Sequence, residues 1–128
     1  MKLLLDTHVV LWAAGQPERL SDSARTLLTT PDNMLFFSVA SIWEIVIKRG
    51  LGRDDFKVNP RRLREMLVSH GYSELAVGAE HVLAIESLPP IHKDPFDRLL
   101  LAQAQTEGML LLTVNATVSK YKESVLSV

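Results

Sequence analysis

Two short, fully apolar runs mark the strands around which the chain is organised. Residues 3–5 near the start are all leucine, and residues 109–112 near the end are all apolar and are followed by Thr113. Runs without a polar face are typical of strands buried on both sides, as in a parallel sheet. Asp6 follows the first run, and the second ends at Thr113 with Asn115 just beyond. In an open α/β sheet the chemistry lies outside the carboxyl ends of the strands, so these polar residues are candidates for function.

The segments between the two runs carry alternating strand and helix signals. Apolar spacing, capping residues and Gly or Pro stops predict helices over residues 8–14, 21–30, 39–49, 60–70, 78–88, 94–107 and 116–121, and further strands over 34–37, 73–77 and 125–128. Strands that alternate with helices predict a parallel sheet covered by helices on both faces. With 128 residues, the whole chain, 1–128, is expected to form one α/β domain.

Composition removes several kinds of site. The chain has no cysteine, which excludes disulfides, thiolate metal sites and Cys nucleophiles. Its four histidines show no zinc-type spacing, and its net charge of −1 gives no global basic field. No apolar stretch approaches the roughly 18 residues that span a membrane, and the N-terminus has no signal-peptide pattern. We therefore expect a soluble, cytoplasmic protein.

The helix predicted over residues 39–49 is apolar almost all round. Apart from Arg49 at its end, its exceptions are Ser41, Glu44 and Lys48, which are three and four positions apart and so form one polar stripe. The stripe is either a narrow solvent face with a Glu44–Lys48 pair or the lining of a cleft. Because a helix that is apolar all round is usually buried, we favour the cleft and expect Trp43 to lie in the core.

Two acids open the helix that follows the Pro-Pro break. Asp94 is suited to cap the helix, Pro95 to its first position and Asp97 to its first turn, so capping alone would explain both acids. Two carboxylates in one turn, beside Lys93 and Arg98, also suit metal and phosphate chemistry.

Four acids are therefore placed where they would converge, if the strand ends and the two helices meet. Carboxylates that pack together repel one another unless a cation or protons compensate. Oxygen ligands without sulfur suit a hard cation, so we expect Mg²⁺ or Mn²⁺. The candidates are Asp6, Glu44, Asp94 and Asp97.

Half of the 14 basic residues fall within residues 48–64. We take this cluster as a candidate RNA-binding track, and the alternative is an ordinary solvated helix and loop. The residues chosen as RNA contacts are Lys48, Arg49, Arg61 and Arg62.

Four motifs, in this order and spacing, resemble those of PIN-domain proteins, and above all the VapC-type toxins of bacterial toxin–antitoxin pairs. They are Leu3-Leu4-Leu5-Asp6-Thr7-His8, Ser41-Ile42-Trp43-Glu44-Ile45, His92-Lys93-Asp94-Pro95-Phe96-Asp97-Arg98-Leu99-Leu100-Leu101-Ala102-Gln103-Ala104, and Leu111-Leu112-Thr113 followed by Tyr121. Each motif alone is weak, but together they cover essentially the whole chain.

The resemblance implies a three-layer α/β/α fold with a central parallel sheet of four to five strands. It also implies a Mg²⁺- or Mn²⁺-dependent ribonuclease that leaves a 5′-phosphate and a 3′-hydroxyl. Asp6, Glu44 and Asp97 match the family's metal-binding acids, and Asp94 matches an extra acid of one branch. Asn115 stands where a fourth acid is usual, which leaves the number of metal ions and the level of activity open.

The neighbouring polar residues receive supporting roles on the same basis. We expect Ser41 and Thr113 to hydrogen-bond metal-bound water or the carboxylates. Lys93 and Arg98 are expected to meet phosphate, with pairing to an acid as the alternative for Arg98. Asp94 is the candidate that orients or deprotonates the attacking water.

The family also implies a small antitoxin partner and a homodimer. Two other functions stay open from the sequence. One is a metal-dependent nuclease or phosphoesterase that acts on DNA. The other is a weakly active or inactive PIN-like module that binds RNA or protein, because Asn115 replaces an acid.

Overall fold

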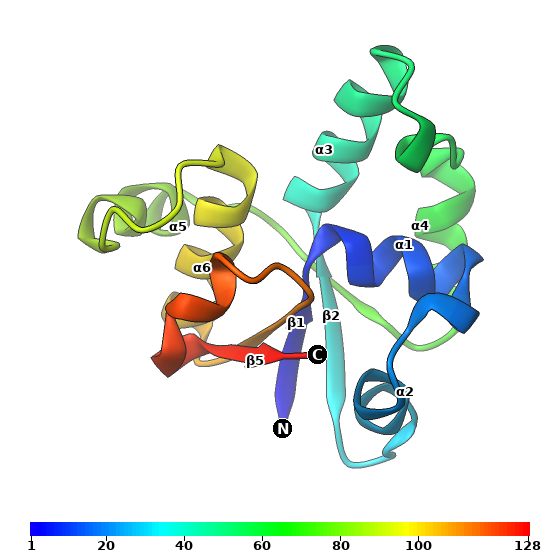
Figure 1. Cartoon of the computed structure of the whole chain (residues 1–128), viewed down its shortest axis with the longest axis horizontal. Coiled ribbons are helices and arrows are strands. Elements are labelled where there is room, and N and C mark those ends of the chain that lie inside the picture. Colours follow the sequence, from blue (N-terminus) through cyan, green and yellow to red (C-terminus); the bar gives the residue numbers. More distant parts are fainter.

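A computed structural model describes all residues, 1–128, as five parallel strands between layers of helices (Figure 1). The strand order is β3-β2-β1-β4-β5, so the first strand lies in the middle of the sheet. The strands are β1 (Lys2–Leu5), β2 (Met34–Ser38), β3 (Ser73–Leu75), β4 (Leu110–Thr113) and β5 (Val125–Ser127). The predicted α/β/α architecture with a parallel sheet is confirmed.

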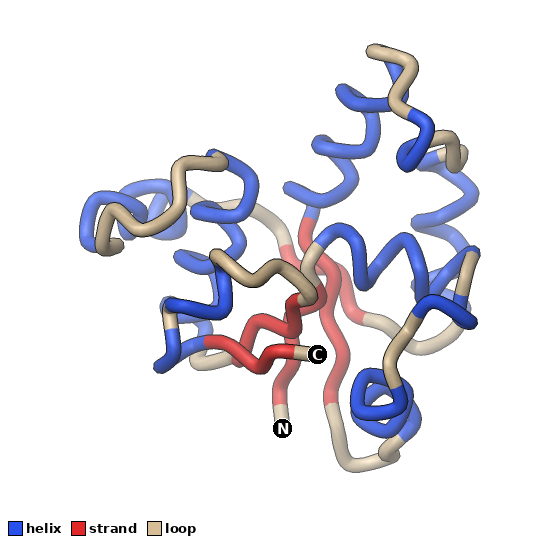
Figure 2. The backbone as a smooth tube through the Cα atoms, in the orientation of Figure 1, coloured by secondary structure: helices blue, strands red, loops and turns tan.

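The two apolar runs of the sequence lie side by side at the centre of this sheet (Figure 2). Leu4 pairs with Leu111 on one side and with Phe36 on the other, and Leu3 to Leu5 are fully buried. Because all five strands are parallel, their carboxyl ends meet at one edge. Asp6 and Thr113 are therefore neighbours there although 107 positions separate them.

Helices cover both faces of the sheet. They are α1 (Thr7–Gly15), α2 (Asp22–Thr29), α3 (Val39–Gly50), α4 (Pro60–Ser69), α5 (Ala79–Ala84) and α6 (Pro95–Glu107), with short 3₁₀ helices at Pro17–Arg19, Asp54–Phe56, Ile85–Ser87, Val118–Lys120 and Lys122–Ser124. Figure 1 places α5 and α6 on one side of the sheet and α1, α2 and α4 on the other. No helix is both long enough and apolar enough to cross a membrane.

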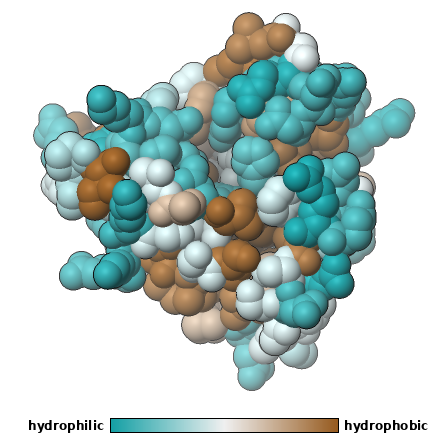
Figure 3. Space-filling view, viewed as in Figure 1, coloured by the Kyte–Doolittle hydropathy of each residue, from teal (hydrophilic) through white to brown (hydrophobic).

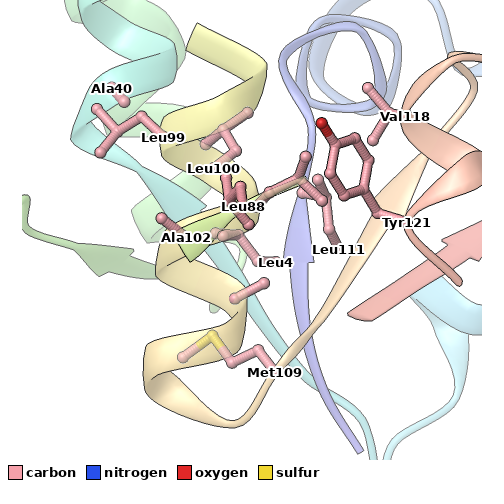
Figure 4. Packing of buried hydrophobic residues seen from close by; sticks show 12 residues of the cluster. Leu4, Ala40, Leu88, Leu99, Leu100, Ala102, Met109, Leu111, Val118 and Tyr121 are labelled. Carbon is pink, nitrogen blue, oxygen red and sulfur yellow. The ribbon is translucent and has the colours of Figure 1, made fainter. Parts of the chain in front are cut away.

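Each face of the sheet has its own apolar core. Leu4 and Leu111 point into the core beneath α6, with Leu100 and Tyr121 (Figure 4). Leu5 and its neighbours Leu112 and Phe37 belong to the core beneath α1 and α4. Ala40 of α3 lies in the first core and Ile45 in the second, so α3 passes across the carboxyl edge of the sheet.

The predicted helix boundaries are close to the observed ones because their caps form as expected. Ser21, Asn59 and Asp94 each cap a helix with a side-chain oxygen. Gly108 ends α6 with φ +68°, a conformation that favours glycine. Two predicted helices differ: that over 78–88 ends at Ala84 and continues only as a 3₁₀ turn, and that over 116–121 forms only the 3₁₀ turn Val118–Lys120.

The prediction that α3 is buried all round is wrong. Its polar stripe faces inward, with Ser41 and Glu44 0% and 4% exposed. Its apolar side faces outward, and Trp43, Val46 and Ile47 are 55%, 50% and 37% exposed. Figure 3 shows apolar side chains at the surface where α3 ends, at the top of the view. The stripe thus faces the protein interior at the sheet edge and is not a solvent face, and Trp43 is not a core residue.

Candidate active site

Asp6 lies at the carboxyl end of β1, where it caps α1. Its Oδ1 accepts the Val9 amide at 2.9 Å, and its Oδ2 accepts the Thr113 hydroxyl and the Val114 amide. The side chain is buried, with the whole residue only 5% exposed. Burial raises the pKa of Asp6, although these hydrogen bonds and the nearby His8 act in the opposite direction.

Glu44 projects from α3 toward the same edge. Its Oε1 accepts the Thr7 hydroxyl at 2.6 Å, and its Oε2 accepts the Lys48 ammonium at 2.5 Å. Thr7 also lies 3.0 Å from the Ser41 hydroxyl. Thr7 directly follows Asp6, so one hydroxyl joins the end of β1 to the polar stripe of α3.

The start of α6 supplies the remaining acids. Asp94 accepts the amides of Phe96 and Asp97 at 2.9 and 3.2 Å, so the capping role predicted for it is real. Asp97 itself caps nothing, and its Oδ2 accepts a hydrogen bond from His92 Nε2 at 2.7 Å. Because one acid suffices for the cap, Asp97 is free for another task.

The charges of the acids act on one another. Burial is the main cause that raises the pKa of Asp97, and the nearby charges of Asp94 and Glu44 raise it further, while the His92 hydrogen bond acts against them. The charge of Glu44, which comes from a helix more than 50 positions earlier, therefore acts on Asp97. Burial and the neighbouring carboxylates thus both disfavour the charged form of Asp97, and a bound cation would favour it.

The donor set fits a hard divalent cation. Asp6, Glu44 and Asp97 offer carboxylate oxygens only, which is what Mg²⁺ and Mn²⁺ prefer. These three do not form a group whose ligand atoms all lie within 4.8 Å of one another. A Mg²⁺ ion usually keeps several waters, so it does not need all three carboxylates as direct ligands.

Asn115 has a structural task. Its Oδ1 accepts the amides of Thr117 and Val118 at 2.8 and 3.2 Å, which starts the turn after β4. Its own amide donates to the Thr113 hydroxyl at 3.0 Å, and that hydroxyl donates to Asp6. Asn115 thus shapes the loop beside Asp6, and its carbonyl oxygen is already engaged.

The loop before α6 is held by hydrogen bonds from two side chains, Arg98 of α6 and Tyr121 near the end of the chain. The Arg98 guanidinium donates to the carbonyls of Ile85, Pro89 and His92 at 3.2, 3.4 and 3.1 Å, so it does not pair with an acid here. The buried Tyr121 hydroxyl donates to the Pro89 carbonyl at 2.6 Å and accepts the His92 amide at 2.9 Å. Lys93, between these contacts, is exposed.

Sequence reasoning missed Thr7, His92 and Tyr121 as parts of the site. Thr7 and His92 stand within the quoted motifs, next to or five positions before an acid, which was the available signal. Tyr121 gave none beyond its place in the motif, because its partners lie about 30 positions earlier.

The basic cluster divides in the structure. Lys48 faces Glu44 inside the site. Arg53, Lys57 and Arg64 pair with the carboxylates of Asp55, Asp54 and Glu74. Arg49, Arg61 and Arg62 are exposed and form no ion pair. Only these three remain as a free basic surface.

A second group of potential metal ligands lies elsewhere, where α5 meets the end of α6. Glu80, His81 and Glu107 have ligand atoms within 4.8 Å of one another. However, His81 Nδ1 accepts the Gly78 amide at 2.9 Å and its Nε2 donates to Glu107 at 2.8 Å. Both ring nitrogens are therefore used in tying α5 to α6, and neither is free for a metal.

Fold and site define the class: a parallel α/β protein with carboxylates gathered at the carboxyl edge of its sheet. The sequence model of the PIN domain matches residues 3–123, and the chain belongs to the PIN-domain family. A sequence search among curated proteins gives no match.

Solved structures of similar fold include toxin–antitoxin complexes. VapBC2 from Rickettsia felis, bound to a DNA fragment from its promoter, matches with a TM-score of 0.72 and 16% identity over 99% of this chain and 98% of that one. VapBC-1 from nontypeable Haemophilus influenzae gives 0.65 and 16%, over 99% and 98%. A toxin–antitoxin complex from Klebsiella pneumoniae gives 0.63 and 18%, over 98% and 96%. At these identities the likeness establishes the fold.

Proposed function

We propose that this protein is a metal-dependent endoribonuclease and the toxin of a type II toxin–antitoxin pair. Two observations carry the proposal: Thr7, which directly follows Asp6, donates to Glu44, and the charge of Glu44 acts on Asp97 at the start of α6. The family membership and the toxin–antitoxin complexes among proteins of similar fold support it.

The three carboxylates would hold Mg²⁺ or Mn²⁺, which supplies a bound water of lowered pKa and neutralises charge on the scissile phosphate. Asp6 is oriented for this by Thr113 and the cap of α1. His92 orients Asp97. Asp94 has one oxygen in the helix cap, and its other oxygen is available to accept a proton from the attacking water.

The RNA track is the exposed surface beside α3 and α4. A groove of about 370 Å³ between these helices is lined by Ile42, Val46, Pro60, Arg61, Arg64 and Glu65. Arg49, Arg61 and Arg62 are free to meet phosphates near it. Lys93 is exposed close to Asp94 and is a further phosphate contact.

The partners follow from the same proposal. The chain would bind a small antitoxin protein in the cytoplasm and would form a homodimer. The outward apolar side of α3, with Trp43, Val46 and Ile47, supports an interface with protein, because large exposed apolar patches mark such surfaces.

The deciding experiment is cleavage of structured RNA with and without Mg²⁺ or Mn²⁺. Wild type should cut only with metal, and Asp6→Asn and Asp97→Asn should abolish cutting while circular dichroism shows an intact fold. Asp54→Asn is the matched control, since Asp54 is an exposed acid outside the cluster, and it should cut like wild type. Metal-independent cleavage, or activity that survives both substitutions, would refute the mechanism. A DNA duplex and single strand in parallel test the DNA-directed alternative.

A weakly active or inactive binding module remains the second candidate, because Asn115 offers no charge and its oxygen is engaged in a turn. Asn115→Asp keeps the turn, since Asp caps as well as Asn. If the site lacks one acid, this change should raise metal affinity and cleavage rate. If the protein is a binding module, RNA should bind without being cut by wild type or by this variant.

A further inference from the structure

We propose that Lys48 is a built-in cation that occupies the metal-binding acid Glu44 and is displaced when a divalent metal binds. The inference rests on the proposed metal site and assigns the Lys48 ammonium as a competitor of the metal for Glu44. Its starting point is that both carboxylate oxygens of Glu44 are engaged: Oε1 by the Thr7 hydroxyl at 2.6 Å and Oε2 by the Lys48 ammonium at 2.5 Å.

The ammonium of Lys48 is held in a defined place. The side chain is 19% exposed and reaches Glu44 across one turn of α3. It lies 4.9 Å from the centre of the Phe56 ring and 5.9 Å from that of Phe96, close enough for both rings to attract a cation. Phe96 is itself packed edge-on against Trp43, with ring centres 4.9 Å apart.

Lys48 is also different from the other basic residues near it. Arg53, Lys57 and Arg64 pair with acids at the surface, where side chains are mobile and water screens the charge. The Glu44 side chain is only 6% exposed, so its charge depends on a partner inside the protein. Among the three acids proposed to hold metal, Glu44 is the one that a lysine or arginine already neutralises.

A divalent ion and the ammonium compete for the same oxygen. A divalent ion bound to Oε2 would lie beside the ammonium, and because the two like charges repel, metal binding favours the ammonium moving away from Glu44. The ammonium stabilises the fold when no metal is bound, and the work of removing it lowers the apparent affinity for metal. A charge-assisted hydrogen bond of this kind corresponds to about a tenfold change in an equilibrium constant.

The test is metal binding by Lys48→Met, which keeps a long apolar side chain against Phe56 and Phe96 and removes the ammonium. The control is Lys57→Met, which removes the same charge from an exposed pair with Asp54. Mn²⁺ affinity is measured by titration calorimetry and by the electron paramagnetic resonance signal of free Mn²⁺. We expect Lys48→Met to bind Mn²⁺ about tenfold more tightly and Lys57→Met to bind like wild type.

Thermal melting gives an independent readout. In chelator, Lys48→Met should melt below wild type, and Mn²⁺ should raise its melting temperature more than it raises that of wild type. If Lys48→Met does not fold in chelator, Lys48→Arg retains a cation on Glu44 and should bind Mn²⁺ no more tightly than wild type. Unchanged or weaker Mn²⁺ binding by folded Lys48→Met, or tighter binding by Lys48→Arg, would overturn the proposal.

One further variant separates this inference from the proposed function. If wild type binds no Mn²⁺, the proposed metal-dependent function is wrong, and so is the proposed competition between Lys48 and the metal for Glu44. If wild type binds Mn²⁺ and Glu44→Gln weakens binding, but Lys48→Met leaves it unchanged, the metal site stands and only the role of Lys48 is wrong.

Discussion

Tyr121→Phe should destabilise the protein and impair the site although Tyr121 touches none of the acids. Its hydroxyl uses its full capacity: it donates to the Pro89 carbonyl at 2.6 Å and accepts the amides of Ile91 and His92 at 3.1 and 2.9 Å. These three groups belong to the loop that brings His92 to Asp97. Removal of one oxygen atom therefore unpairs the loop at three points.

The magnitude follows from those three bonds. The phenylalanine ring keeps the packing of Tyr121, which is 5% exposed, so the apolar contribution is unchanged. At about 1 kcal/mol for each net hydrogen bond, the free energy of unfolding should fall by roughly 2–3 kcal/mol. For a domain of this size that corresponds to a melting temperature lower by about 10 °C.

Tyr72→Phe is the matched control, since these are the chain's two tyrosines. Tyr72 is half-buried, burial raises its pKa, and its hydroxyl has no hydrogen-bond partner within the protein. Its removal should change the free energy of unfolding by less than about 0.5 kcal/mol. Urea and thermal denaturation followed by circular dichroism measure both variants.

Activity measured well below the melting temperature completes the test. With the loop loosened, His92 no longer holds Asp97 in one place, so cleavage by Tyr121→Phe should be slower even in fully folded protein. Equal stability losses in the two tyrosine variants, or a folded Tyr121→Phe that cleaves at the wild-type rate, would show that the hydroxyl does not position the site.

Three further outcomes are expected. Burial raises the pKa of Asp97, so the native state holds a proton there more tightly than the unfolded chain does. Without metal, the stability that this proton contributes is lost as pH rises through the folded pKa. The melting temperature of Asp97→Asn should therefore depend less on pH than that of wild type, and an identical dependence would contradict the assignment. Arg98→Lys should lower the free energy of unfolding, measured by chemical denaturation, by about 1–2 kcal/mol. One ammonium cannot reach the carbonyls that the guanidinium joins. Unaltered stability would show that these hydrogen bonds are weak. The double variant Arg61→Glu, Arg62→Glu should bind RNA more weakly than wild type. Titrations at several salt concentrations should show that the slope of log affinity against log salt concentration falls by about two. An unchanged slope would show that these arginines do not belong to the RNA surface.

The roles of Asp94 and Asp97 could be assigned only from the sequence and the tertiary structure together. Asp94 carries a cap that sequence signals predicted, and the same signals assigned Asp97 to the helix dipole. Only the fold shows that Asp94 alone fills the cap and that Asp97 meets His92 and the field of Glu44. Local capping rules describe one turn of helix, whereas the use of Asp97 depends on a loop and a helix that the turn itself does not contain.

What the sequence by itself determined is the sheet and its edge. Residues that are apolar on every side must be buried on every side, so Leu3 to Leu5 and the run before Thr113 became the central strands, and Asp6 had to follow one of them. The tertiary structure alone decided which face of α3 points inward. The pattern of α3 suggested burial all round, but the site draws Glu44 and Lys48 inward and leaves Trp43 exposed. Side-chain periodicity specifies which residues share a face of a helix, while the direction of that face depends on the acids and strands brought to the same edge from elsewhere in the chain.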